Sequence, residues 1–155
     1  HKISDRNNFE FRPPSRPRNS GPFKRLPMAT KPNTTAWIVD DEPVNRILAC
    51  AFLRHMGWTT REFGSDQETL DAAAAGCPAL MIVDVSMPNM SGPELVRRLR
   101  QLPASRNTRF VAYTAHCLSD EIDHMKQAGF EHVLTKPVSF QHMRNALHGL
   151  TPVEP

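Results

Sequence analysis

Short apolar runs alternate along the chain with stretches in which apolar residues recur every three or four positions. The runs predict strands at 36–39, 59–63, 79–83, 109–113 and 132–135. The recurring stretches predict helices at 43–56, 65–75, 93–99, 119–128 and 139–150. Strand 79–83 has no polar position, which is typical of a strand covered on both faces at the centre of a parallel sheet.

Several residues mark where the predicted helices begin. Pro43 and Pro93 stand where the first turn of a helix tolerates proline. Ser65, followed by Glu68, predicts a capping box, and Ser119 is expected to cap a later helix. Glycines are expected to end three of the helices, at Gly57, Gly76 and Gly129.

The first predicted helix has apolar residues at intervals of three and four positions, which predicts one buried face. These residues are Val44, Ile47, Leu48, Ala51 and Phe52. We expect this face to pack against the sheet.

Five strands alternating with five helices predict a doubly wound α/β fold, a five-stranded parallel sheet with helices on both faces. In such folds the functional sites lie beyond the carboxyl ends of the strands. The strand ends are therefore the places to search for chemistry.

Composition agrees with one globular domain followed and preceded by short tails. The chain has 155 residues, of which 39% are hydrophobic and 23% charged. It has neither a membrane-length apolar run nor a secretory signal, so we expect a soluble protein. We expect the domain to span 36–150, with a C-terminal tail at 151–155.

The net charge of +3 comes from the first 35 residues, which hold eight Lys or Arg against two acids and six of the 14 prolines. We expect this segment to be a poorly ordered tail. The start at His1 and the "MATKP" at Met28 favour an added leader over residues 1–27, with Met28 as the natural start. The alternative is a native basic arm for a nucleic acid or a membrane.

The chain contains three cysteines, Cys50, Cys77 and Cys117, in apolar or helical surroundings. Their odd number and wide spacing indicate free thiols in a reducing compartment rather than a disulfide framework. We therefore expect a cytoplasmic location.

Polar residues follow four of the predicted strands. Asp40 and Asp41 follow the first strand, Asp84 the third, Thr114 the fourth and Lys136 the fifth. Where these strands are neighbours in a parallel sheet, their carboxyl ends converge on one crevice. Three carboxylates in one crevice repel each other unless a cation neutralises them.

This set of side chains favours phosphoryl transfer. Oxygen ligands without His or Cys favour Mg²⁺, with Mn²⁺ as the alternative. Lys136 supplies a charge for a phosphoryl oxygen, and Thr114 supplies a hydroxyl donor. One carboxylate would be the nucleophile, since carboxylates form acyl phosphates.

Four segments in this order resemble the signature segments of response regulator receiver domains, and the resemblance covers 36–150. The segments are VDDEP at 39–43, VDVSMPNMSG at 83–92, YTAH at 113–116 and LTKPV at 134–138. The resemblance implies a (βα)5, flavodoxin-like fold with strand order 2-1-3-4-5. It also implies the function of that family, acceptance of a phosphoryl group in two-component signalling.

The resemblance assigns roles to the acidic residues. Asp84 would be the phosphoacceptor. Asp41 and Asp84 would bind Mg²⁺ directly together with the backbone carbonyl of Ser86, while Asp40 would act through water.

The remaining signature residues would complete the site. Thr114 and Lys136 would bind phosphoryl oxygens, and the Lys136–Pro137 bond would be cis. The family usually has Tyr or Phe three residues before this lysine as part of the switch with Thr114, but this chain has Val133 there. His132 would point to the opposite face of its strand, so it is a poor substitute.

Three further residues are expected at the rim of the crevice: Glu42, Ala115 and His116. His116 would tune the access of water to the phosphoryl group, or it is a solvated loop residue. Glu42 would contribute to the rim, or it is only an acid favoured by the helix dipole.

The resemblance further implies a histidine kinase or histidine phosphotransfer protein as phosphodonor and a downstream protein that the sequence does not identify. A homodimer is compatible with it, and we expect no binding of nucleic acid or membrane by the domain itself. The stretch 42–57 resembles receivers of hybrid kinases, so the domain is either stand-alone or part of such a kinase.

We expect a domain that catalyses its own phosphorylation and dephosphorylation rather than a classical enzyme. An aspartyl-phosphate phosphatase usually needs a second acid two residues after the nucleophile, where this chain has Ser86. The alternative is a receiver-like interaction module that works without phosphorylation, and Val133 is its best support.

Overall fold

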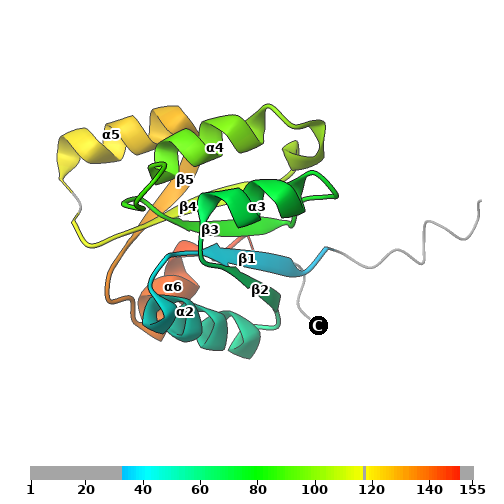
Figure 1. Cartoon of the computed structure of the whole chain (residues 1–155). Coiled ribbons are helices and arrows are strands. Elements are labelled where there is room, and N and C mark those ends of the chain that lie inside the picture. The colour runs from blue at the N-terminus through cyan, green and yellow to red at the C-terminus, as the bar shows by residue number, and fades with distance from the viewer. Residues whose placement is uncertain (1–32, 117, 151–155) are drawn as a thin grey trace, which may run out of the picture. The chain divides into compact units, whose positions relative to one another are not determined.

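The computed structural model describes residues 33–116 and 118–150, in which five parallel strands form one sheet in the order β2-β1-β3-β4-β5 (Figure 1). The strands are β1 (Thr35–Val39), β2 (Thr59–Phe63), β3 (Leu80–Asp84), β4 (Arg109–Thr114) and β5 (Phe130–Thr135). The helices are α2 (Pro43–His55), α3 (Asp66–Ala73), α4 (Gly92–Arg100), the short 3₁₀ helix η1 (Pro103–Ser105), α5 (Ser119–Ala128) and α6 (Phe140–Ala146). The predicted fold class and strand order are confirmed.

The helices form one layer on each face of the sheet, with α3, α4 and α5 on one side and α2 and α6 on the other (Figure 1). The α4 core, on the first side, consists of Trp37, Val39, Phe63, Ala73, Met81, Val83, Met87, Leu95, Val96, Leu99, Phe110, Ala112, Met125, Ala128 and Phe130. The α2 core, on the second side, consists of Ala36, Ile38, Ala49, Cys50, Leu53, Trp58, Leu80, Ile82, Val111, Tyr113, Leu134, Val138, Met143 and Leu147. Every residue of β3 is buried, as expected for the central strand.

Strand register aligns the carboxyl ends of the strands. Val39 lies opposite Val83, and Asp84 lies opposite Tyr113. A register shift between β4 and β5 after Phe110 still leaves Thr114 opposite Thr135. The residues that follow these strands therefore emerge at one edge of the sheet.

The predicted buried face of α2 is wrong. The side chains that α2 buries are Ala49, Cys50 and Leu53. Val44 and Ile47 are instead 70% and 60% exposed, and Ala51 is exposed as well. Leu48 and Phe52 are half-buried against the α2 core. The helix is apolar around much of its circumference, so contacts with the sheet, rather than the spacing, set its rotation.

Two predicted helix starts need correction. Ser65 Oγ accepts a hydrogen bond from the Glu68 backbone N–H at 3.2 Å, as a capping box requires. The Glu68 carboxylate, however, accepts from the Gly64 N–H at 3.2 Å rather than from Ser65. Ser119 is the first residue of α5 and not its cap, because Leu118 occupies the N-cap position.

The last helix is shorter than predicted. Ser139 Oγ caps α6 by accepting from the His142 N–H at 3.0 Å, and the helix ends at Ala146. Residues 147–150 form turns, which begin with the C-cap Leu147 and leave its side chain fully buried. The helix therefore ends four residues before the predicted end at residue 150.

Some predictions lie partly or wholly outside the described residues. Of the predicted tail at 1–35, only residues 33–35 are described, and Thr35 already opens β1. Residues 151–155 and Cys117 also lie outside. Cys50 and Cys77 are free, and burial raises the pKa of both thiols. Within the described part of the chain, every helix is too short or too polar to cross a membrane.

Candidate functional site

Three carboxylates meet at the carboxyl edge of the sheet. Asp40 and Asp41 follow β1, and Asp84 is the last residue of β3. One oxygen atom from each lies within 4.8 Å of the others. Asp40 is fully buried and Asp84 is 3% exposed, whereas Asp41 is exposed. The cluster therefore has two buried charges and opens to solvent at Asp41.

Lys136, which follows β5, bridges the two buried carboxylates. Its Nζ lies 2.9 Å from Asp40 Oδ2 and 3.1 Å from Asp84 Oδ1. Burial lowers the pKa of Lys136, but the two carboxylates outweigh it, and the pKa is raised above its usual value. The side chain is therefore a stable positive charge within the cluster.

Asp84 is less stable as an anion than an ordinary aspartate. Burial and, after it, the neighbouring charge of Asp40 raise its pKa to about 6, against the lowering effects of Lys136 and of the Ser86 N–H. One ammonium thus compensates only partly for two buried carboxylates. The site has an excess of negative charge that a further cation would neutralise.

Both buried carboxylates also bind the backbone that follows them. Asp40 Oδ1 accepts a hydrogen bond from the Glu42 N–H at 2.9 Å. Asp84 Oδ1 accepts one from the Ser86 N–H at 3.2 Å. These turns, typical of aspartate, fix the start of each loop relative to its carboxylate. Glu42 itself is exposed at the N-cap of α2 and makes no side-chain capping bond.

Arg46, on α2, is a site residue that the sequence analysis missed. Its Nη1 donates to the Asp40 carbonyl oxygen at 2.6 Å, and its Nε lies 3.1 Å from Glu62 Oε1 on β2. The guanidinium ties the end of β1 to the neighbouring strand and to α2. The available signal was an arginine one turn into the helix that follows the aspartates, but a solvated arginine fits that position equally well.

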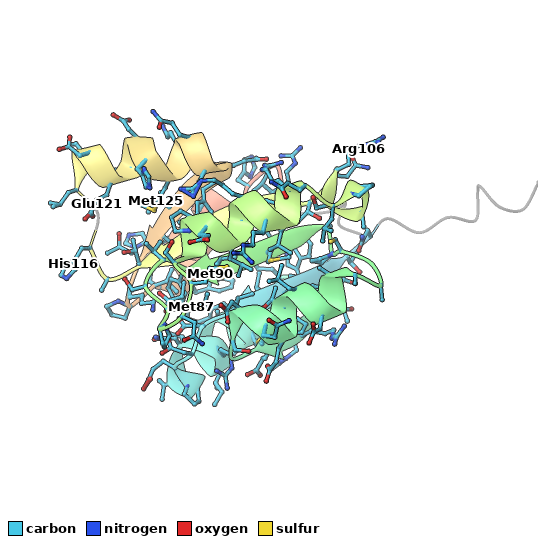
Figure 2. The ribbon with its side chains drawn as sticks, turned by 45° about the horizontal axis from the view of Figure 1, so that its top comes forward. Met87, Met90, Arg106, His116, Glu121 and Met125 are labelled. Atoms are coloured by element: carbon cyan, nitrogen blue, oxygen red, sulfur yellow. The ribbon has the colours of Figure 1, made fainter. Side chains whose placement is uncertain are left out.

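The loop after β3 is packed closely against the end of that strand. The Gly92 N–H donates to the Val85 carbonyl at 2.9 Å. A Cβ atom at Gly92 would collide with the Asp84 carbonyl oxygen and lie 2.9 Å from Val85 Cα, so glycine is required there. Figure 2 shows Met87 and Met90 on this loop; Met87 belongs to the α4 core, and Met90 packs against it.

Thr114, at the end of β4, uses its hydroxyl within its own loop. The hydroxyl donates to the His116 carbonyl oxygen at 2.8 Å and accepts from the His116 N–H at 3.2 Å. Thr114 is 7% exposed, whereas Ala115 and His116 are exposed, and Figure 2 shows His116 at the margin of the molecule. The Thr114 carbonyl accepts from the Lys136 N–H at 2.7 Å, which holds the ends of β4 and β5 together.

Position 133 of β5, three residues before Lys136, is not aromatic. Val133 is half-buried against the α4 core, and His132 is exposed. The Lys136–Pro137 peptide bond is cis, as the resemblance implies.

Comparison with known proteins gives the family. A family model described as the response regulator receiver domain matches residues 36–148. The chain belongs to the response regulator receiver family. The match runs from the second residue of β1 to two residues after the end of α6.

The receiver is similar to segments of much longer sensor kinases. It is 30% identical over 110 residues to the sensor histidine kinase RcsC of Salmonella typhi, covering 71% of this chain and 11% of that kinase. It is 30% identical over 113 residues to the signal transduction histidine-protein kinase BarA of Shigella flexneri, covering 73% of this chain and 12% of that one. The receiver thus spans about a ninth of the length of these relatives.

Solved structures share the fold. The chemotaxis protein CheY4 of Vibrio cholerae superposes with a TM-score of 0.71 at 23% identity, covering 76% of this chain and 98% of that one. The receiver domain of the sensor histidine kinase PA1611 of Pseudomonas aeruginosa superposes with a TM-score of 0.68 at 23% identity, covering 76% and 97%. That structure has a magnesium ion coordinated in its active site cleft.

The receiver's own residues fit a magnesium ion. The cluster supplies hard carboxylate oxygens, which Mg²⁺ prefers, and it retains negative charge after Lys136 is counted. Asp41, the exposed member, leaves the cluster open to solvent. The two candidate phosphoryl ligands differ: Lys136 contacts Asp84, whereas Thr114 is held by His116.

Proposed function

We propose that this receiver accepts a phosphoryl group on Asp84 from a phosphohistidine in a reaction that requires Mg²⁺. One observation carries the proposal: a buried carboxylate at a strand end is paired with a lysine and lies within 4.8 Å of two further carboxylates. A merely structural ion pair has no need of the two additional negative charges, which raise the energy of the folded state. Phosphoryl transfer needs such a cluster.

In the proposed step an Asp84 oxygen attacks phosphorus. The new O–P bond forms as the N–P bond to the donor histidine breaks, and the electron pair of that bond goes to the imidazole nitrogen. Lys136, already 3.1 Å from Asp84, would turn to the phosphoryl oxygens as charge develops on them. When bound, Mg²⁺ would neutralise the carboxylates and the phosphoryl oxygens.

The ion would be held by Asp41, Asp84 and the Ser86 backbone carbonyl, with Asp40 acting through water. The oxygen donors of the cluster and the magnesium in the related PA1611 receiver support this assignment. The Ser86 N–H bond to Asp84 already places that residue beside the cluster. Mn²⁺ would be an acceptable substitute because it takes the same ligands.

The response to phosphorylation would begin at Thr114. Its hydroxyl would exchange the His116 carbonyl for a phosphoryl oxygen, which would release the loop after β4. Partner affinity would then change at the loops after β4 and β5 and at α5 and α6. Val133 would contribute through its contact with the α4 core rather than through an aromatic ring.

The phosphodonor would be a histidine kinase or a histidine phosphotransfer protein. A donor histidine must reach Asp84, so its protein must cover the surface beside the crevice. The first turns of α2 lie there and expose Val44 and Ile47, which would contact the donor helix. The similarity to receivers within RcsC and BarA supports such partners. The proposed signalling unit is 36–150, with a cytoplasmic location.

Acetyl phosphate and beryllofluoride test the proposal without a cognate kinase. Mass spectrometry should find a phosphoryl adduct on Asp84 that needs Mg²⁺, disappears with EDTA and is lost in Asp84→Asn. A slow return to the unmodified mass would reflect hydrolysis by the domain itself. An adduct that forms equally in Asp84→Asn would refute Asp84 as the acceptor. No adduct at all would support a receiver-like interaction module that works without phosphorylation.

A further inference from the structure

Tyr113 lies at the floor of the crevice, next to the residues that would bind the phosphoryl group. It is fully buried in β4, where it pairs with Asp84 on β3 and with Leu134 on β5. The Lys136 Nζ lies 5.0 Å from the centre of its ring. An ammonium at this distance over an aromatic face is within the range of a cation–π interaction.

The hydroxyl of Tyr113 does not explain why a tyrosine ring is there. Within the described part of the chain no hydrogen bond joins it to Lys136, Asp40 or Asp84. Burial raises its pKa, while the nearby Lys136 charge and the backbone amide of Val138 act in the opposite direction. The ring, and not the hydroxyl, therefore makes the close contact with the site.

The contacts of Lys136 show what the ring contributes. The ammonium is drawn to Asp40 Oδ2 at 2.9 Å and to Asp84 Oδ1 at 3.1 Å. The negative face of the Tyr113 ring, which belongs to β4, gives the ammonium a third favourable contact. Such a contact would favour one position of Lys136 between the carboxylates and so preorganise its charge for an incoming group.

We propose that Tyr113 is a positioning residue whose ring holds the Lys136 ammonium between Asp40 and Asp84, ready for phosphoryl oxygens. The proposal rests on the proposed function of Asp84 as phosphoacceptor. It gives an aromatic residue of β4 a role in the phosphoryl site. Position 133 of β5, where the family usually has an aromatic residue, is valine in this receiver.

The test separates the electrostatics of the ring from its shape. Tyr113→Phe keeps the ring and its negative face, whereas pentafluorophenylalanine at 113 keeps the shape and reverses the charge of the face. Beryllofluoride affinity is measured by calorimetry at saturating Mg²⁺. Tyr113→Phe should bind within about threefold of the unmodified protein, and the pentafluoro variant about tenfold to thirtyfold more weakly, as expected for a desolvated cation–π contact.

Two further measurements show whether the effect passes through Lys136. The affinity for Mg²⁺ alone should stay within about twofold in both variants, because Lys136 is not a metal ligand. In a Lys136→Met background the difference between the two ring variants should vanish, as a double-mutant cycle requires for a single shared contact. A merely structural role of Tyr113 would change Mg²⁺ affinity as well and would persist without the lysine.

Phe110 provides a matched control. It lies on the same strand, is fully buried and has the Arg100 guanidinium 5.0 Å from its ring centre, but it faces the α4 core. Fluorination there should leave beryllofluoride affinity unchanged. Equal affinity of the two Tyr113 variants would overturn the positioning role while the function of Asp84 stands. If the unmodified protein forms no Mg²⁺-dependent adduct, the function and the positioning role fail together.

Discussion

Replacing Asp84 with asparagine should stabilise the folded protein at neutral pH. The carboxylate is 3% exposed, and burial followed by the charge of Asp40 raises its pKa to about 6. Lys136, at 3.1 Å, does not remove this penalty. Asparagine has a similar shape and no charge, so Asp84→Asn removes an anion that folding makes less stable.

The size and the pH range of the effect follow from linkage. An aspartate in the unfolded chain has a pKa of about 3.9, and one pKa unit corresponds to about 1.4 kcal/mol. A folded-state pKa of about 6 for Asp84 therefore costs on the order of 3 kcal/mol of stability when the group is fully ionised. Well below pH 4 the group is protonated in both states and the penalty is absent; it develops as the pH rises from about 4 to about 6 and is complete above that range.

Urea unfolding of both proteins in EDTA, at pH 4.0 and at pH 7.5, measures this difference directly. Asp84→Asn should be more stable by about 2–3 kcal/mol at pH 7.5, and the difference should shrink toward zero at pH 4.0. Asp41→Asn is the control, because Asp41 is exposed and its charge is solvated in the folded state. Equal stabilities at pH 7.5, or a difference that persists at pH 4.0, would refute the reasoning.

Three further predictions concern the metal, the loop after β3 and the donor surface. Mg²⁺ should raise the free energy of unfolding by about 1.4 kcal/mol per tenfold excess over its Kd, and Asp41→Asn should lose most of this gain in the same urea assay. Gly92→Ala should destabilise the fold by about 1–3 kcal/mol because its Cβ collides with the end of β3. Ser91 Oγ caps α4 by accepting from the Glu94 N–H, so Ser91→Ala should cost about 1 kcal/mol; thermal unfolding compares the two variants. Ile47→Glu should slow phosphotransfer from a phosphohistidine protein at least tenfold but leave phosphorylation by acetyl phosphate unchanged, and equal slowing of both reactions would exclude a docking role.

The order of elements could be predicted from the sequence because most of the strands are short apolar runs and because proline and glycine mark several of the helix boundaries. The rotation of α2 could not. Val44 and Ile47 belong to one apolar stripe and Ala49, Cys50 and Leu53 to another, and either satisfies a helical period. Which stripe is buried depends on how the helix packs on the sheet, information that local spacing does not contain.

The candidate site, too, could be predicted from the sequence only in part. Asp40, Asp84 and Lys136 were predicted to converge because parallel strands end at one edge, and the structure brings them within ion-pair distance. The roles of Arg46 and Tyr113 in the site were not predicted. Tyr113 looks like an ordinary core residue within an apolar strand, and its contact with Lys136 exists only once β4 and β5 lie side by side. Residues that act through a second residue leave no pattern of their own in the sequence.

The division of the sheet into two faces has a consequence for the order of events in signalling. Asp84 follows Ile82 in alternation and lies toward the layer of α2 and α6, whereas Thr114 follows Ala112 and lies toward the layer of α3, α4 and α5. A donor that docks on α2 would leave the opposite layer uncovered. Phosphotransfer at α2 and partner binding at α5 would then use separate surfaces, so a downstream partner that binds α5 need not wait for the donor to leave.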